Sequence, residues 1–299
     1  MSVTTIGPAE SSAGAPKVTA QTLLEKKRAK QPIAALTATD YPTGRLVDEA
    51  GIDLVLVGDS LAMTVLGYPD TLSITMDEML HHTRAVRRGV RRALLVADMP
   101  YGSYHVSPDE AVRNGIRFLK EAGAEAVKLE GGRARAALVE NLTVAEVPVV
   151  GHIGLTPQSL HRMGGYKVQG KSVPAIESLM ADAAALEGAG AMALVVEGVP
   201  REVAAQITAA STIPVIGIGA GPDCDGQILV FHDLCKLTFA DGAKFVRRFA
   251  DGEAVLRDGL REYSEAVRAR SFPADQESYH LPKGVAEELS ELQLAGGAR

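Results

Sequence analysis

The stretch "DLVLVGDSLAMT", residues 53–64, sets the pattern for the rest of the chain. A run of branched apolar residues, Leu54 to Val57, breaks at Gly58 and ends in Asp59 and Ser60. A short, continuously apolar run of this kind is typical of a strand that is buried on both faces. The acid that follows it either caps the next helix or holds a ligand, and Asp59 alone does not decide between the two.

Seven further runs of the same character occur along the chain, separated by longer amphipathic stretches. They lie at 33–38, 93–98, 125–130, 147–152, 191–197, 213–219 and, more weakly, 227–233. Eight apolar strands that alternate with helices predict an α/β fold, a single (β/α)₈ TIM barrel. A doubly wound open sheet is the alternative, because the sequence does not show whether the sheet closes. The segment after about residue 241 predicts extra C-terminal helices that cover the outside of the barrel.

Capping residues mark several helix boundaries. Thr75 followed by Glu78 predicts a capping box. Ser107 before Pro108 predicts a second helix start, and Gly123 predicts the end of that helix.

Composition limits the classes of protein and the compartment. The net charge of −6 argues against nucleic acid or an anionic membrane as the main partner. No apolar run approaches the roughly 20 residues of a transmembrane helix. The two cysteines, Cys224 and Cys235, exclude a disulfide scaffold and fit a reducing cytoplasm. We expect a disordered leader at residues 1–16, one catalytic barrel at 17–282 and a C-terminal tail at 283–299.

Five consecutive predicted strands carry ionisable residues at their C-terminal ends. These residues are Asp59 (followed by Ser60), Asp98, Lys128, Glu130, His152 and Glu197. In a barrel those strand ends share one face, where active sites lie. Each residue alone has a structural explanation, such as a helix cap or an ion pair. Their recurrence at equivalent positions predicts a site.

The chemistry of this set favours a hard cation. Asp59, Asp98 and Glu130 offer carboxylate oxygens without a thiolate, which suits Mg²⁺ and leaves Mn²⁺ and Co²⁺ as alternatives. A cation would also offset the repulsion among the three acids. Lys128 then supplies positive charge for an anionic substrate, and Glu197 is free to move protons.

Seven motifs in order give the chain a specific resemblance. They are "VGDSLAMTVLGYPDT", "ADMPYGSY", "VKLEGG", "GHIGLTPQS", "GGYKVQGK", "PVIGIGAG" and "DGQILVFHD". Over roughly residues 17–280 the chain resembles the ketopantoate hydroxymethyltransferase family. The resemblance implies a (β/α)₈ barrel, typically a homo-decamer in the cytoplasm, that uses Mg²⁺. It also implies transfer of a hydroxymethyl group from methylenetetrahydrofolate to 3-methyl-2-oxobutanoate through a Mg-stabilised enolate. The product would be 2-dehydropantoate, for pantothenate and coenzyme A biosynthesis.

The same resemblance implies roles for individual residues. Asp59 and Asp98 match metal-binding acids that also contact the substrate, and Glu130 matches the third acid of the metal site. Ser60, Lys128 and His152 match residues that bind the 2-oxo acid. Glu197 matches the catalytic proton acceptor.

Two alternative functions and one undecided loop remain at this point. A metal-dependent lyase or mutase acting on a 2-oxo acid would share the enolate chemistry, although no lyase motif of the KKCGH kind occurs. A non-catalytic barrel that serves in assembly is the alternative from another class. The Gly-rich loop at 156–174 is either a lid or a connector at a subunit contact.

Overall fold

The computed structural model describes residues 16–240 and 242–296. The chain divides into two compact units, residues 1–250 and 251–299. The leader predicted for residues 1–16 lies outside the described residues except for its last position. The predicted domain limits stay predictions.

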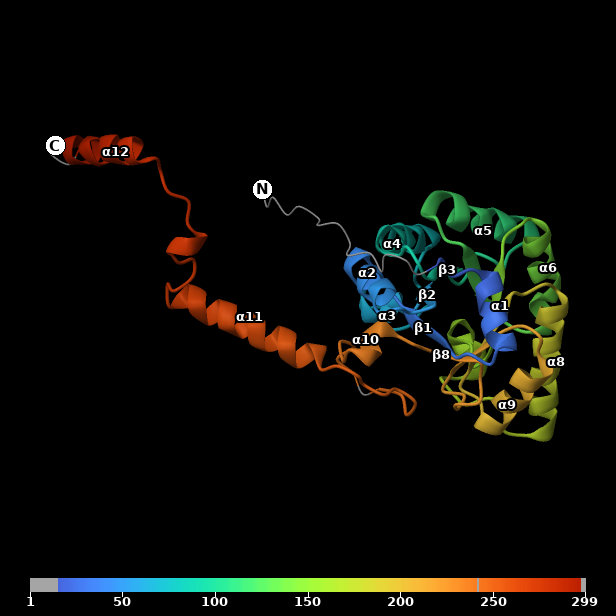
Figure 1. The fold of residues 1–299 in the computed structure, drawn as a ribbon. Helices are drawn as coiled ribbons and strands as arrows, with labels where there is room; N and C mark the ends of the chain where they lie inside the picture. Colours follow the sequence, from blue (N-terminus) through green and yellow to red (C-terminus); the bar gives the residue numbers. More distant parts are fainter. Residues whose placement is uncertain (1–15, 241, 297–299) are drawn as a thin grey trace. The chain divides into compact units, whose positions relative to one another are not determined.

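The first unit is built on a closed barrel of eight parallel strands in the order of the sequence, in which β8 pairs with β1 (Figure 1). The strands are β1 (Ile33–Thr37), β2 (Leu54–Val57), β3 (Leu94–Asp98), β4 (Ala126–Glu130), β5 (Val149–Gly154), β6 (Ala193–Glu197), β7 (Val215–Ile218) and β8 (Gly226–Leu229). All eight predicted strands are present. The closure confirms the TIM barrel and excludes the doubly wound open sheet.

Helices surround the strands. They are α1 (Ala20–Arg28), α2 (Tyr41–Glu49), α3 (Leu61–Thr64), α4 (Met76–Gly89), α5 (Pro108–Ala122), α6 (Ala136–Val144), α7 (Leu160–Met163), α8 (Val173–Gly188), α9 (Arg201–Ala210) and α10 (Phe231–Leu234), with 3₁₀ turns η1 (Arg133–Arg135) and η2 (Pro157–Ser159). The alternation of strands and helices is broken once, because residues 219–225 join β7 to β8 without a helix.

The last predicted strand is too long. Its second half, from Phe231, forms α10 instead, and the Phe231 amide donates to the Thr37 hydroxyl on β1. Thr37 and Phe231 are 194 residues apart in the sequence, so no local sequence pattern predicts this contact. The predicted caps are correct: Thr75 and Glu78 form a capping box, Ser107 caps α5, and Gly123 ends α5 at φ 72°.

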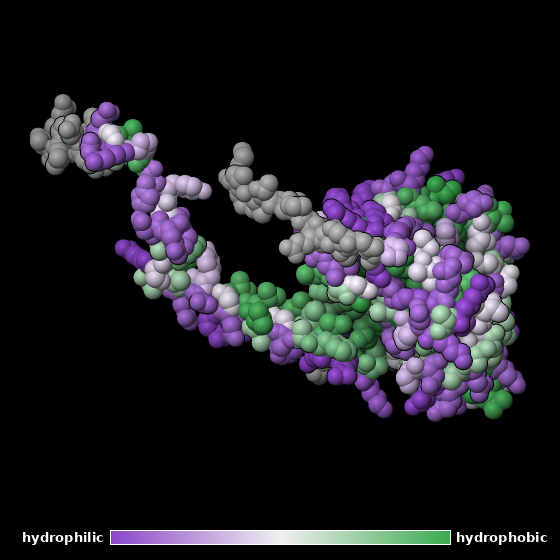
Figure 2. All heavy atoms as spheres, in the orientation of Figure 1, coloured by the Kyte–Doolittle hydropathy of each residue, from purple (hydrophilic) through white to green (hydrophobic). Residues whose placement is uncertain are grey.

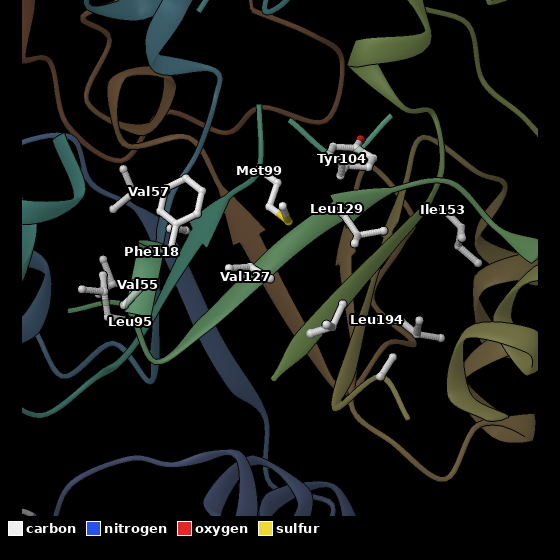
Figure 3. Packing of buried hydrophobic residues seen from close by; sticks show 14 of the residues in the cluster. Val55, Val57, Leu95, Met99, Tyr104, Phe118, Val127, Leu129, Ile153 and Leu194 are labelled. Atoms are coloured by element: carbon white, nitrogen blue, oxygen red, sulfur yellow. The ribbon is translucent and has the colours of Figure 1, made fainter. Parts of the chain in front are cut away.

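Side chains along each strand alternate between two apolar clusters. Leu54 and Leu56 belong to the cluster inside the barrel, whereas Val55 and Val57 belong to the larger cluster that also contains Phe118 of α5. Figure 3 shows part of this outer packing. Burial on both faces explains why the strands are apolar without alternation.

Helix α1 lies across the N-terminal end of the barrel. Leu23 is part of the interior cluster. Lys26 and Lys27 reach Asp53 and Asp225, each at 2.6 Å. This end of the barrel is therefore filled by structural contacts, which leaves the opposite end for a ligand.

The second unit contains α11 (Gly252–Arg268), η3 (Asp275–Glu277) and α12 (Lys283–Gly296). The helical character predicted after residue 241 is confirmed from Gly252, while the packing of these helices on a barrel stays a prediction. Leu256, Leu260, Tyr263 and Val267 recur along one face of α11 and are exposed within this unit. Figure 2 shows how apolar and polar residues are distributed over the surface. Among the described residues no helix is both long and apolar enough to cross a membrane.

Candidate active site

Strand register brings the predicted site residues together. Asp98 on β3 pairs directly with Lys128 on β4, and Glu130 on β4 pairs directly with His152 on β5. Val96, Ala126, Val150 and Val195 belong to the cluster inside the barrel, and the site residues lie two positions further along the same strands. The alternation of side chains therefore directs Asp98, Lys128, His152 and Glu197 to the interior at the C-terminal end.

Asp59 joins the group from just beyond the end of β2. Its backbone amide donates to Asp98 Oδ2 at 2.9 Å. Gly58 leaves space for this approach, since a Cβ at that position would lie 3.1 Å from Ser60 Oγ and 3.5 Å from Asp98 Oδ2. Ser60 opens the short helix α3 without a side-chain cap, so its hydroxyl is not used in a cap.

A chain of ionic contacts runs through the site. Lys128 Nζ lies 2.9 Å from Asp98 Oδ1. His152 lies between two acids, with Nδ1 3.4 Å from Glu130 Oε1 and Nε2 3.2 Å from Glu197 Oε2. Glu197 is the most open acid of these contacts, because its side chain is 15% exposed against 3% for Asp98 and Glu130.

The close contact between His152 and Glu197 depends on a glycine. Gly154 is the register partner of Glu197 on the neighbouring strand. It adopts φ 93°, and a Cβ there would lie 2.2 Å from the Glu197 carbonyl oxygen. A larger residue would force the two strand ends apart.

Electrostatics in the site follow from burial and from the neighbouring charges. Burial, reinforced by the charges of Asp98 and Glu130, raises the pKa of Asp59 well above its usual value. Burial also raises the pKa of Asp98, although the Lys128 ammonium opposes this. Burial opposes the charge on Lys128, but the three acids outweigh it and raise the Lys128 pKa.

His152 is predicted to carry a proton in the absence of other ligands. Burial and the nearby Lys128 disfavour its charged form, but hydrogen bonding to Glu130 and Glu197 outweighs them and raises the His152 pKa to about 9. The same contact lowers the pKa of Glu130 against the opposing effect of burial. Glu130 and His152 therefore each favour the charged form of the other.

Two further buried residues connect the acids, and the sequence analysis assigned them no role. Gln158 Nε2 donates to Asp59 Oδ2 at 2.8 Å, and the Gln158 backbone amide donates to Glu130 Oε2 at 2.9 Å. Tyr104 donates its hydroxyl proton to Gln158 Oε1 at 2.5 Å. Both residues follow strand ends, Tyr104 after β3 and Gln158 after β5. Extending the strand-end criterion into the adjoining loops would have found them.

Two acids of the site have buried oxygens that could face the predicted divalent cation. Asp98 Oδ1 and Glu130 Oε1 are buried and, within residues 16–240 and 242–296, lack a well-directed hydrogen bond even though each lies at ion-pair distance from a cation. Together with the repulsion felt by Asp59, this fits an additional positive charge. No three His, Cys, Asp or Glu side chains in the same residues converge as a complete ligand set. The acids described here could therefore supply one or two carboxylates, and a bound Mg²⁺ would complete its coordination with waters and substrate oxygens.

The loop after β5 approaches the same group of acids. Burial and the charges of Asp70 and Asp59 raise the pKa of Tyr166. The Gln169 amide donates to the Gly198 carbonyl, next to Glu197, at 2.9 Å. The loop therefore borders the site, and its role as a lid or as a subunit contact stays open.

The chain matches a family model and many curated proteins. The model described as ketopantoate hydroxymethyltransferase matches residues 17–275. A protein of Koribacter versatilis (strain Ellin345) named 3-methyl-2-oxobutanoate hydroxymethyltransferase is 65% identical over 277 residues, which are 93% of this chain and 94% of that protein. A protein of the same name from Thermoanaerobacter sp. (strain X514) is 50% identical over 267 residues, or 89% and 97% of the two chains.

Solved structures show the same fold at low sequence identity. Phosphonopyruvate hydrolase in complex with oxalate and Mg²⁺ superposes with a TM-score of 0.59 and 14% identity, covering 94% of this chain and 99% of that one. A 2,3-dimethylmalate lyase of the PEP mutase/isocitrate lyase superfamily has a TM-score of 0.54 and 16% identity, covering 94% and 98%. At these identities the likeness concerns the fold alone.

Proposed function

The chain belongs to the ketopantoate hydroxymethyltransferase family and is thereby a transferase, and from this premise we propose the details of its reaction. It transfers a hydroxymethyl group from methylenetetrahydrofolate to 3-methyl-2-oxobutanoate, giving 2-dehydropantoate for pantothenate and coenzyme A biosynthesis. The observation that carries the proposal is the convergence of a buried Lys–Asp pair and a His held between two glutamates at the C-terminal end of the barrel.

In this proposal Asp59 and Asp98 would hold Mg²⁺, with Glu130 beside them or joined through water. When bound, the ion would polarise the 2-oxo group of the substrate and so make its C3 proton more acidic. The solved phosphonopyruvate hydrolase complex contains Mg²⁺ and oxalate, a small dicarboxylate, in the same fold class. Support from this chain is the raised pKa of Asp59, which a cation would relieve.

Lys128 and Ser60 would bind the 2-oxo acid. The Lys128 ammonium is buried and remains charged, because three carboxylates raise its pKa. A fixed positive charge in a site that excludes water stabilises negative charge as it develops on the substrate oxygens. His152 would contribute from beside Lys128, with its Nδ1 3.3 Å from Lys128 Nζ, and its ring reaches both Glu130 and Glu197.

Glu197 would accept the C3 proton as the general base. It is the acid with the most open side chain among those in ionic contact, so a substrate can reach it. The His152 ring, with Nε2 3.2 Å from Glu197 Oε2, orients the Glu197 carboxylate before the proton is taken. The resulting enolate carbon attacks the methylene carbon of the folate and breaks one of its two C–N bonds. A water molecule then displaces the second nitrogen and supplies the hydroxyl group. The C3 proton and one proton of the water end on the two nitrogens of the tetrahydrofolate that leaves.

The state of assembly and the compartment are also proposals. We propose a homo-decamer, in which the apolar face of α11 is covered by the barrel of the same subunit or of another one. We keep the prediction that the enzyme works in the cytoplasm. Neither nucleic acid nor a membrane is expected as a partner, given the net charge of −6.

The decisive experiment is deuterium exchange at C3 of 3-methyl-2-oxobutanoate, followed by NMR, with and without Mg²⁺ and before any folate is added. Metal-dependent exchange supports an enolising site. Adding methylenetetrahydrofolate should then yield 2-dehydropantoate. If a folded, metal-loaded sample shows no exchange either alone or with tetrahydrofolate, the proposed reaction is wrong.

A further inference from the structure

The side chain of Gln158 makes contacts that no role in the proposed reaction explains. It is buried, and it lies in the loop after β5 rather than on a strand. Its Nε2 donates to two acceptors, Asp59 Oδ2 at 2.8 Å and the Met99 carbonyl oxygen at 3.0 Å. Its backbone amide binds a third, Glu130 Oε2. One residue thus occupies one oxygen of each of two acids that repel each other.

Tyr104 determines which way the Gln158 amide faces. The Tyr104 hydroxyl accepts a hydrogen bond from the Glu130 backbone amide at 3.2 Å. Its single proton is therefore free to go to Gln158 Oε1, at 2.5 Å. A flipped amide would place Oε1 against the Met99 carbonyl and against Asp59, which must be ionised to bind a cation, and neither group can then donate. Only one orientation satisfies every group, and both side chains are buried away from competing water.

We propose that Gln158 and Tyr104 are positioning residues for the metal-binding acids. The oriented amide holds Asp59 Oδ2, so that the other carboxylate oxygen is the one presented to a divalent cation. The backbone amide of Gln158 holds Glu130 in the same way. This inference rests on the proposed metal site and extends it, because it makes cation affinity depend on two residues that do not bind the cation.

The test compares two substitutions with matched controls. Gln158→Met keeps a side chain of similar length but removes the amide, and Tyr104→Phe removes only the hydroxyl. Gln206→Met, at an exposed position of α9, and Tyr101→Phe, at a half-exposed ring, are the controls. Calorimetry and Mn²⁺ electron paramagnetic resonance measure cation affinity of the full-length protein, and thermal unfolding in EDTA measures the stability of the metal-free fold.

We expect Gln158→Met to weaken Mn²⁺ and Mg²⁺ binding by 10- to 100-fold, roughly the effect of losing a partner of a metal ligand. Tyr104→Phe should weaken binding less, because the amide remains but is free to flip. Both controls should match the wild type. If Gln158→Met does not fold, Tyr104→Phe alone carries the test.

Three results would count against the proposal, and they differ from one another. Folded variants that bind the cation with an affinity within twofold of the wild type would overturn it, even if their melting temperature is lower. Gln158 and Tyr104 would then have a structural role only. Equal losses in the controls would also overturn it. Absence of cation binding by the wild type would overturn the proposed metal site, and this inference with it.

Discussion

Asp98 and Lys128 are register partners on neighbouring strands, and Lys128 Nζ lies 2.9 Å from Asp98 Oδ1. Both side chains are almost entirely inaccessible. A buried ion pair of this kind adds little net stability, because desolvation offsets most of the attraction. Removing one partner is different, since it leaves a charge buried without compensation. The pair therefore makes the site sensitive to single substitutions.

Replacing Lys128 by Met should lower the free energy of unfolding of the metal-free protein by roughly 3–5 kcal/mol, because Asp98 loses its counter-charge. Urea denaturation in EDTA measures this. The double variant Lys128→Met with Asp98→Asn should recover most of the loss, since the Asp98 charge that lost its ion-pair partner is removed as well. A double variant as unstable as the single one would show that packing, rather than charge, causes the effect.

Glu197→Gln should abolish C3 exchange while it preserves the binding of cation and 2-oxo acid. The amide cannot accept the proton, and loss of a general base typically lowers a rate by about 10²–10⁴-fold. NMR of the substrate in D₂O measures exchange, and calorimetry measures binding. Glu202→Gln, in the exposed first turn of α9, is the matched control. Exchange at the wild-type rate in Glu197→Gln would exclude Glu197 as the base.

Asp59→Asn should weaken cation binding at least tenfold and yet stabilise the metal-free protein. The folded state raises the pKa of Asp59, so ionised Asp59 is disfavoured on folding. This destabilisation is absent below the unfolded-state pKa of about 4 and develops as pH rises. The stability gain of Asp59→Asn over the wild type in EDTA should therefore grow from pH 4 to 8. A variant that is less stable at every pH would contradict this account.

The stability of the metal-free protein should fall between about pH 6.5 and pH 9 because of His152. Its pKa is about 9 when folded and about 6.5 when unfolded, so the folded state binds one extra proton in this window. The stabilisation is complete below pH 6.5 and is lost as pH rises through 9. The slope is at most about 1.4 kcal/mol per pH unit.

Denaturation of His152→Gln across the same pH range checks this prediction. The slope should flatten in that variant and persist in His81→Gln, an exposed position of α4. If His152→Gln keeps the full slope, another group binds the proton.

Substituting the apolar face of α11 should reduce the size of the assembly. Leu256, Leu260, Tyr263 and Val267 recur at helical spacing and are 43–69% exposed. Introducing Asp at Leu256 and Leu260 would place charges at any contact that covers this face. Sedimentation velocity should then show smaller species than the wild type, with Asp258→Ala plus Glu262→Ala as the control. An unchanged sedimentation coefficient would mean that α11 does not join subunits.

Most of the fold could be predicted because strand and helix signals are local. The apolar run at 53–59, the capping pair Thr75 and Glu78, and Gly123 each depend on a few neighbouring residues. The end of β8 could not be predicted, because α10 begins where the Phe231 amide contacts Thr37 on β1, the first strand of the barrel. A contact between residues so distant in sequence leaves no periodic pattern.

The order of residues alone indicated eight buried strands, five of which carry acids, a lysine or a histidine at their C-terminal ends, because these signals are local. Only the tertiary structure decided that the sheet closes, and that Asp98 pairs with Lys128 while Glu130 pairs with His152. It also decided that Gln158 reaches Asp59 across 99 residues. Register between strands and the reach of a loop depend on packing of the whole barrel, so no single segment encodes them.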